Sequence, residues 1–418
     1  MLINAPRGTM DILPKDSRVW RYVEGVFADV CDAFGYGELR MPIFEHSELY
    51  LRGVGETTDI VQKEMYTFSD RGLRSVTLRP EGTAGVVRAF LENKLQNEPL
   101  PAKFYYNGPM FRYERPEAGR FRQFSQLGVE AIGSHDPAMD AEIIALTMEF
   151  YRRLGIEKAD LLINSVGCAK CRPIHRQALV DSVSARREEL CPDCQNRLEK
   201  NPLRIFDCKN EHCQEIIAGA PRVTDYLCDD CKQHMAALQS YLQAYGLQYR
   251  IDANLVRGLD YYTRTVFEVY YPDRTVMGSA IGAGGRYNGL VEELGGHDLP
   301  GVGVALGVDR AIMVLQASKT NPVSAPPLKV FLAAIGGEAH LLATEMIAEL
   351  RKHDIYCDQD YLNRGLKAQM KYADKLGAET VAIIGEDELA RGIILLRDMA
   401  TKEQVELTKD AFLSHFLP

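Results

Sequence analysis

The alternation of apolar and polar residues divides the chain into helices and strands. From Ser17 to Phe34 the apolar side chains form one stripe at helical spacing, which predicts an amphipathic helix. The same spacing predicts helices at 84–95 and 139–154. Short apolar runs near turn residues predict strands at 38–44 (broken by Pro42), 75–78, 103–108, 122–133 and 265–271, and a strand running into a helix over 301–315.

The pattern changes at two places, which predicts separate domains. Cysteine pairs and short helices interrupt the regular elements, and a proline-containing segment without periodicity precedes the last part of the chain. That last part alternates strands (329–335, 355–357, 380–384) with helices (340–353, 366–376), which predicts a small α/β domain with a parallel-leaning sheet. The expected boundaries are a core at 1–164 and 246–320, an insertion at 165–245, a linker at 321–328 and a C-terminal domain at 329–418.

Composition narrows the class of protein. The 418 residues include 49 Lys and Arg against 58 Asp and Glu, a net charge of −9. This balance argues against binding nucleic acid by bulk charge, although a local basic groove stays open. No window approaches 18 consecutive apolar residues, and the N-terminal residues lack the apolar region of a secretory signal. Neither a membrane span nor export is therefore expected.

Eight of the ten cysteines form a cluster of doublets. Without an export signal, such a cluster favours metal over disulfides. The insertion also has little apolar content, so we expect it to lack a core of its own. Eight thiols can form two tetrahedral zinc sites, and four doublets can pair in three ways. Buried reduced thiols, an iron–sulfur cluster or disulfides stay open, as do His175, His212 and His234 as substitute ligands; the doublets are Cys168/Cys171, Cys191/Cys194, Cys208/Cys213 and Cys228/Cys231.

The two remaining cysteines, Cys31 and Cys357, are isolated in the sequence. We expect each to be a small buried apolar residue.

Two stretches in the first third carry candidate chemistry. Glu81 and Thr83 are two residues apart in an extended segment, so they can share a side and receive the N–H groups of an ammonium; an ordinary turn is the alternative. The second stretch is an arginine-rich loop between two strands, and arginine guanidinium groups match phosphate oxygens bidentately. Gln126 and Glu130 follow on the return strand at alternate positions, so they share a face. A solvated charged hairpin is the alternative for the arginines Arg112, Arg115, Arg120 and Arg122.

Two further stretches follow the cysteines. Val256-Arg-Gly-Leu-Asp-Tyr-Tyr262 combines charge and aromatic rings beside an apolar strand. Ala283-Gly-Gly-Arg-Tyr287 is followed by Gly303-Val-Ala-Leu-Gly-Val-Asp-Arg310, whose glycines allow a ligand to approach the backbone or a sheet to pack tightly.

Together these stretches resemble histidyl-tRNA synthetases, which are class II aminoacyl-tRNA synthetases, over nearly the whole chain. Residues 25–42 resemble motif 1, 105–130 motif 2 and 303–310 motif 3, while Arg257–Tyr262 and Ala283–Tyr287 resemble the two histidine-specific peptides. The resemblance implies an α/β fold (an α+β catalytic core). It would comprise an antiparallel sheet with flanking helices, a cysteine-rich, mostly helical insertion and a C-terminal α/β anticodon-binding domain.

The resemblance also implies the reaction: ATP-dependent ligation of L-histidine to tRNA(His) through histidyl-adenylate, in a cytoplasmic homodimer formed through motif 1, with no membrane or DNA partner. Mg²⁺ would bind the β- and γ-phosphates. The structural zinc would be one or two ions without a catalytic role.

The implied residue roles fall into three groups. In catalysis, Arg112 would hold the α-phosphate of ATP and Arg257 would lie on the opposite side of that phosphate. In ATP binding, Arg310 would hold the γ-phosphate, and Glu114 would belong to the same site. The histidine ammonium would meet Glu81, Thr83 and Gln126, and the imidazole Glu130 and Tyr262, with Tyr261 and Tyr287 as walls. The tRNA acceptor end would meet Arg115 and Arg120, whereas Glu117 departs from the glutamine common in bacterial relatives.

Two other classes stay open. A regulatory subunit of ATP phosphoribosyltransferase shares the catalytic fold without activating histidine, but such relatives usually lack the motif arginines and the anticodon domain. An RNA-binding translational-control module would use the cysteine-rich insertion.

Overall fold

The computed structural model describes residues 3–55, 58–116, 119–318, 323 and 325–417. The chain forms two compact units, Met1–Val323 and Ser324–Pro418. Of the predicted linker 321–328, positions 321, 322 and 324 lie outside the described residues. Across the described part of the chain, no helix has both the length and the apolar character needed to cross a membrane.

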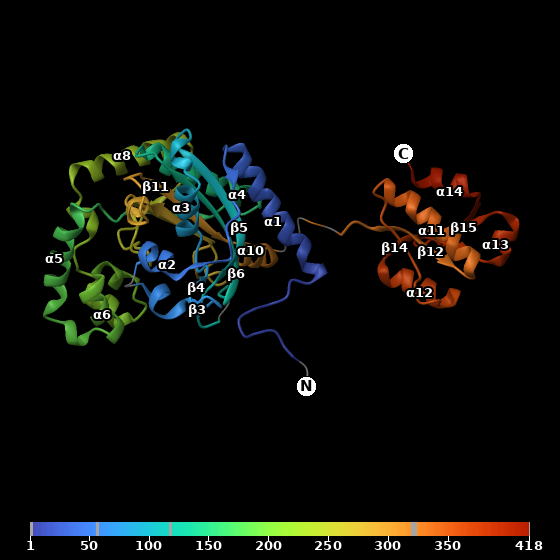
Figure 1. Cartoon of the computed structure of the whole chain (residues 1–418), viewed down its shortest axis with the longest axis horizontal. Helices are drawn as coiled ribbons and strands as arrows, with labels where there is room; N and C mark the ends of the chain where they lie inside the picture. The colour runs from blue at the N-terminus through green and yellow to red at the C-terminus, as the bar shows by residue number, and fades with distance from the viewer. Residues whose placement is uncertain (1–2, 56–57, 117–118, 319–322, 324, 418) are drawn as a thin grey trace. The chain divides into compact units, whose positions relative to one another are not determined.

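An eight-stranded sheet forms the centre of the first unit (Figure 1). All neighbouring strands are antiparallel except the two edge pairs, β1 with β5 and β7 with β8. This sheet confirms the antiparallel class II core. In spatial order the strands are β1 (Gly37–Glu38), β5 (Ala102–Phe111), β6 (Gln123–Ile132), β11 (Gly301–Gly307), β10 (Gly282–Arg286), β9 (Thr263–Tyr270), β7 (Asp160–Ser165) and β8 (Arg250–Ile251).

Neighbouring residues of a strand point to opposite faces of a sheet, and here both faces carry apolar side chains. Helices therefore cover both faces. On β5, Tyr105 belongs to the core under α1, α4 and α10, whereas Tyr106 belongs to the core under α3. The α3 side also contains the tyrosines of the histidine-specific peptides. The helices are α1 (Pro14–Ala33), α3 (Thr83–Glu92), α4 (Pro137–Arg153), α9 (Leu290–Glu293) and α10 (Val308–Ala317).

A small antiparallel sheet lies between α1 and α3 in the sequence. Its order is β2 (Phe44–His46), β4 (Ser75–Leu78), β3 (Tyr66–Ser69), and it is accompanied by α2 (Ser47–Val54) and a π-helical turn at Ile60–Glu64. The segment predicted as a strand broken by Pro42 forms two short strands in different sheets. β1 joins the large sheet and β2 the small one, and Arg79 donates to the carbonyls of Met41 and Pro42 between them.

The insertion is mostly helical and has a small core, contrary to the expectation from its low apolar content. Its core side chains include Leu179, Leu198 and Ile205, packed with three buried cysteines. The helices are α5 (Cys171–Ser184), α6 (Pro192–Lys200), α7 (Glu211–Ile217) and α8 (Asp229–Ala244), with 3₁₀ turns at Arg187–Glu189, Pro202–Asp207 and Val223–Tyr226.

The second unit is the α/β domain expected from the sequence, but its sheet is mixed. Strand β12 (Leu328–Ala334) is parallel to β13 (Cys357–Gln359) and β14 (Ala378–Ile384), and the next two strands are antiparallel. The predicted strand at 355–357 begins at Cys357 instead. The remaining elements are β15 (Ile394–Asp398), β16 (Gln404–Leu407), α11 (Gly337–Lys352), α12 (Leu366–Leu376), α13 (Glu386–Arg391) and α14 (Lys409–Phe416).

Both isolated cysteines are buried free thiols: Cys31 lies in the core of the first unit and Cys357 in that of the second. Their predicted role as small apolar residues is confirmed.

Candidate active site

Glu130 is the centre of a buried hydrogen-bond group. Its carboxylate accepts from the hydroxyl of Thr83 at 2.7 Å and from that of Tyr287 at 2.6 Å, and its side chain is almost fully buried. Strand register places Gly303 opposite Glu130, and a Cβ at Gly303 would lie 1.8 Å from a carboxylate oxygen. The loose glycine pattern of the third motif therefore makes room for this acid.

Glu81 precedes α3 and accepts from the first free backbone amides of that helix. The expectation of an extended segment through Thr83 is wrong, because Thr83 is the first residue of α3. One carboxylate oxygen accepts from the backbone N–H of Thr83 at 2.7 Å and the other from that of Ala84 at 2.9 Å. Helix N-termini carry unpaired N–H groups, so this contact stabilises the helix and fixes the carboxylate. Each oxygen keeps a lone pair for another donor, such as an ammonium.

Six of the seven predicted histidine-binding residues line one cavity, together with Tyr106 and Arg112, and the seventh, Glu130, is bonded to two of them. Two polar atoms at this cavity, the hydroxyl of Tyr106 and Oε1 of Gln126, are buried without a hydrogen-bond partner among the described residues. Buried polar groups are normally paired, so these atoms are available to a polar ligand. The six are Glu81, Thr83, Gln126, Tyr261, Tyr262 and Tyr287.

Burial raises the pKa of Glu130 to about 8, against the lowering effect of the hydrogen bonds from Tyr287 and Thr83. Burial also raises the pKa of Glu81. A histidine ring N–H that donates to Glu130 would favour the charged form and lower this pKa.

The raised pKa predicts a pH dependence of stability. The folded state retains the Glu130 proton up to a pH of about 8, whereas an unfolded carboxyl loses it near 4.5. The contribution of this group to the unfolding free energy is therefore fully present below a pH of about 4.5, and it falls as the pH rises from there to about 8. In Glu130→Gln this contribution is absent, so the stability of the variant relative to the wild type should rise between pH about 5 and about 8.5 in urea unfolding. Exposed Glu157→Gln is the control; a Glu130→Gln difference that stays constant with pH would contradict the shift.

A second cavity collects the arginines of motifs 2 and 3. Arg112, Arg120 and Arg310 line it with Glu114, and it shares Arg112 and Gln126 with the first cavity. Arg112 is oriented by its Nε, which donates to the carbonyl of Pro80 at 2.8 Å. Three guanidinium groups around one space form a site for phosphate oxygens.

Arg310 is held by two backbone carbonyls and by no carboxylate among the described residues. Its Nε donates to Gly119 at 3.1 Å and its Nη1 to Ala280 at 2.6 Å. Burial, followed by the nearby charge of Arg120, lowers its pKa. Gly119 has a φ of +72° and lies against Arg310, which accounts for a glycine in the motif 2 loop.

Arg120, predicted to bind tRNA, lines the second cavity and donates to Glu114 at 3.3 Å. Arg115 is exposed. Position 117, where the sequence has a glutamate in place of the glutamine expected from the resemblance, lies outside the described residues.

Arg257 does not line the second cavity and pairs with Glu268. The other oxygen of Glu268 accepts from the hydroxyl of Tyr270 at 2.6 Å. The guanidinium carbon of Arg257 is 5.8 Å from the centre of the Tyr262 ring, so the arginine borders the first cavity. Sequence reasoning missed Glu268, whose only signal was its place on the strand after the first histidine-specific peptide.

Arg286, inside the second histidine-specific peptide, has no contact with either cavity. It is fully buried and pairs with Asp140, while its Nη1 donates to the carbonyl of Ser134 at 2.7 Å. His234 also contacts Asp140, at 3.3 Å. This network fixes the backbone next to Tyr287 and removes His234 from the set of metal ligands.

The eight clustered cysteines form two groups, which selects one of the three pairings. In each group the four sulfurs lie within 4.8 Å of one another. The Cys168–Cys171 distance is 3.7 Å, and Cys168–Cys228 and Cys191–Cys208 are both 3.8 Å. Four sulfurs bound tetrahedrally at ~2.3 Å from zinc lie about 3.8 Å apart. The groups are Cys168, Cys171, Cys228 and Cys231, and Cys191, Cys194, Cys208 and Cys213.

Backbone amides point at these sulfurs, as in metal sites with oriented ligands. The N–H of Cys228 donates to Cys171 Sγ at 3.1 Å, and that of Cys191 to Cys213 Sγ at 3.2 Å. The histidine substitutes are not used, because His175 bonds the carbonyl of Pro221 and His212 is exposed beside two glutamates. All ten cysteines are free, so the disulfide alternative is not supported.

An antiparallel sheet that joins a buried polar pocket to an arginine-lined cavity is the arrangement expected of a class II aminoacyl-tRNA synthetase. Comparisons with known proteins agree. Residues 8–311 match the family model "Histidyl-tRNA synthetase" and residues 329–417 match "Anticodon binding domain". The chain belongs to the histidyl-tRNA synthetase family.

Individual relatives match over almost their full length. Histidine–tRNA ligase of Desulforamulus reducens is 53% identical over 409 residues, covering 98% of this chain and 97% of the relative. That of Pelotomaculum thermopropionicum is 53% identical over 415 residues, covering 99% and 97%. The crystal structure of apo histidyl-tRNA synthetase from S. aureus is 41% identical with a TM-score of 0.82, covering 99% of this chain and all of the other.

Proposed function

We propose that this chain activates L-histidine with ATP and transfers the histidyl group to tRNA(His). The observation that carries the proposal is the adjoining pair of cavities, one lined by histidine-binding candidates and one by arginines, with Arg112 and Gln126 in both. A carboxylate bound in the first cavity would meet an α-phosphate at their boundary. There it would displace pyrophosphate in line, and preorganised cations would stabilise the developing charge.

Donor and acceptor matching supports histidine as the amino acid. The free Oε1 of Gln126 and the carboxylate of Glu81 suit an ammonium. Glu130 accepts from one imidazole N–H and the hydroxyl of Tyr262 meets the second nitrogen, while Tyr261 and Tyr287 wall the ring. A side chain without these two nitrogens would leave buried polar groups unpaired.

ATP would bind with its α-phosphate on Arg112 and its γ-phosphate on Arg310, and we add Arg120 to this set because of its place beside Arg310. Arg257 would reach the other side of the α-phosphate by exchanging its contact with Glu268 for the ligand. Mg²⁺ supplies charge neutralisation on the β- and γ-phosphates. Glu114, which lines the same cavity, offers it a carboxylate oxygen.

Two structural zinc ions would hold the insertion, one in each cysteine group, since both groups have the spacing of tetrahedral sites. We expect protein purified without chelator to contain about two equivalents of zinc. Cys171→Ser and Cys194→Ser should each remove about one equivalent and lower the unfolding midpoint of the insertion.

The control for the zinc experiment is Cys31→Ser, which changes a buried cysteine far from both groups and should leave the metal content unchanged. Elemental analysis that finds less than half an equivalent of zinc in the wild-type protein would contradict the assignment of the two cysteine groups as zinc sites.

The tRNA would meet the exposed Arg115 at its acceptor end and the second unit at its anticodon. That unit belongs to the anticodon-binding family, although its sequence has 11 Lys and Arg against 15 Asp and Glu, so its RNA-binding face must be local. Apolar side chains exposed near motif 1, Ile43 and Phe44, support a homodimer through this region.

The regulatory-subunit alternative is disfavoured because the chain retains the phosphate-site arginines and the anticodon-binding domain. The activity is tested by charging a tRNA(His) transcript with labelled histidine. We expect ATP-dependent charging that a non-cognate transcript does not show. Histidine binding without charging would instead support the regulatory role.

A further inference from the structure

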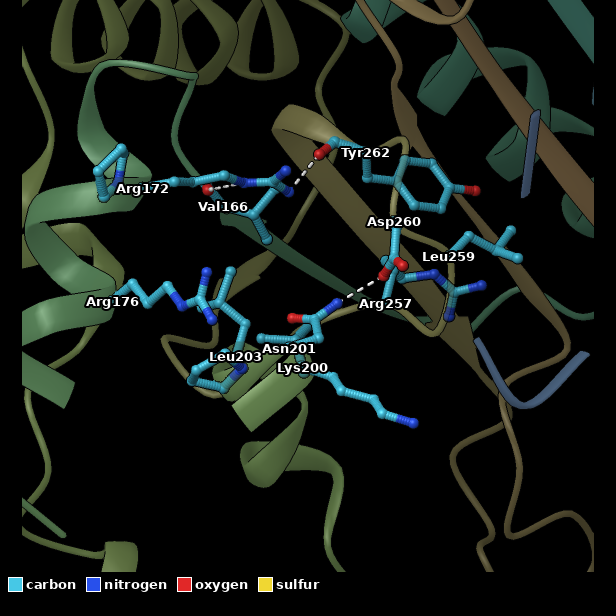
Figure 2. A pocket seen from close by; sticks show the side chains of 13 residues that line it. Val166, Arg172, Arg176, Lys200, Asn201, Leu203, Arg257, Leu259, Asp260 and Tyr262 are labelled. Carbon is cyan, nitrogen blue, oxygen red and sulfur yellow. Dashed lines mark hydrogen bonds between the residues drawn. The ribbon is translucent and has the colours of Figure 1, made fainter. Parts of the chain in front are cut away.

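The backbone of the first histidine-specific peptide is held from the side of the insertion, where it lines a pocket together with α5 and the end of α6 (Figure 2). Arg172 of α5 donates to the carbonyl of Tyr262, and Asn201 donates to the carboxylate of Asp260. Both contacts fix the part of the peptide that follows Arg257. Neither holds the guanidinium group of Arg257, so the position of that group depends on another partner.

The other partner is Glu268 on β9. One of its carboxylate oxygens accepts from Nη1 of Arg257, and the other accepts from the hydroxyl of Tyr270 at 2.6 Å. Glu268 and Tyr270 are two residues apart on the same strand, so their side chains share a face. The guanidinium carbon of Arg274 lies 3.6 Å from the centre of the Tyr270 ring and holds that ring in turn. A chain of contacts therefore leads along the strand to Arg257.

Strand register places Glu268 on the face of the sheet that forms the floor of the active site. Glu268 lies opposite Ala283 of β10, which lies opposite Ala305 of β11, and directly opposite residues share a face. Ala305 lines both the first and the second cavity. Since neighbouring strands are about 4.8 Å apart, the backbone of Glu268 lies about 10 Å from that of Ala305. The two alanine methyl groups cover little of this floor, so Arg257 can reach from Glu268 toward the boundary of the cavities.

The ion pair keeps a largely buried guanidinium charged and leaves part of it free to bind. Burial lowers the pKa of Arg257, but the nearby charges, above all that of Glu268, outweigh this effect and hold the pKa above its ordinary value. Nε of Arg257 is buried without a hydrogen-bond partner among the described residues. Because buried donors are normally paired, this N–H is available to a ligand.

We propose that Glu268 and Tyr270 are positioning residues for histidine activation, an inference that rests on the proposed function. Glu268 would hold Arg257 beside the cavities before ATP binds, so that the guanidinium reaches the α-phosphate from a fixed starting position. When Arg257 moves to the phosphate, the hydroxyl of Tyr270 stays on Glu268, and the buried carboxylate keeps a donor. Neither residue contacts the substrates, and both act through Arg257.

The first test is a double-mutant cycle on Glu268 and Arg257. Glu268→Gln keeps the shape of the side chain and removes its charge, so kcat for histidine-dependent ATP–pyrophosphate exchange should fall at least about 10-fold. The KM for histidine should change less than about threefold, because Glu268 does not line the first cavity. In Arg257→Ala, which has no guanidinium to position, adding Glu268→Gln should lower kcat less than about twofold. Exposed Glu157→Gln is the control.

Two results of this cycle would overturn the inference. One is a kcat for Glu268→Gln within twofold of wild type. The other is an equal fold-loss from Glu268→Gln with and without Arg257, which would mean that the glutamate acts on the fold and not through the arginine. If the wild-type protein itself shows no exchange, the proposed function fails instead, so the two failures are distinguishable.

The second test uses Tyr270→Phe, a milder change that removes one hydroxyl and keeps the ring against Arg274. It should lower kcat about threefold in the wild-type background and have no effect in Arg257→Ala, because its effect passes through Glu268 to the arginine. The control is Tyr249→Phe, whose hydroxyl bonds Gln239 at 3.5 Å and lines neither cavity. A Tyr270→Phe loss of the same size in Arg257→Ala would overturn the inference even if Glu268→Gln does not fold.

Discussion

Glu130→Gln should lower kcat/KM for histidine in ATP–pyrophosphate exchange by about 10³-fold or more. The substitution keeps the shape of the side chain but replaces one acceptor oxygen with an NH₂ group. Thr83 and Tyr287 both donate to the native carboxylate, so one of these donors, or the imidazole N–H, would face another donor. Leaving a buried donor unpaired costs far more than the pair gains in water.

The KM for ATP separates this effect from misfolding. The KM for ATP should stay near the wild-type value in Glu130→Gln, because Glu130 does not line the second cavity, where ATP is proposed to bind. Exchange within tenfold of wild type in a folded Glu130→Gln protein would contradict the role assigned to this acid.

Arg112→Ala should lower kcat for exchange by about 10²–10³-fold while the KM for histidine changes only a few-fold. Arg112 lines both cavities, and its anchored Nε aligns the rest of the guanidinium with their boundary. Its charge would therefore act where negative charge develops on the α-phosphate. Arg112→Lys should recover little of the lost kcat, because a lysine cannot reproduce the two parallel hydrogen bonds of a guanidinium group.

Arg152→Ala is the matched control for Arg112→Ala, since it removes an exposed arginine that pairs with Glu149 on the surface of α4. A loss confined to the KM for histidine in Arg112→Ala would contradict a role on the phosphate.

Elements with strong apolar periodicity could be predicted from the sequence. The helix expected at 366–376 has these bounds in the structure and ends at Gly377, which adopts a φ of +70°. Two of the last elements were missed for a physical reason. Helix α13 has no buried residue and β16 is mostly exposed, so neither carries a hydrophobic pattern.

Strand alternation predicts that Gln126 and Glu130 share a face, whereas the grouping of the other residues of the first cavity came from the resemblance to the family. Two features could not be predicted. The pairing of the cysteine doublets depends on how α5 and α8 fold together, which spacing does not determine. The pairing of Arg286 with Asp140 joins positions 146 residues apart, so a residue of a ligand-binding peptide became part of the buried framework.

Histidine-dependent ATP–pyrophosphate exchange tests the central claim most directly. With ATP, Mg²⁺ and labelled pyrophosphate, the wild-type protein should incorporate label into ATP when L-histidine is added, and not when histidine is omitted or replaced by another amino acid. Histidine binding without any exchange would contradict the account.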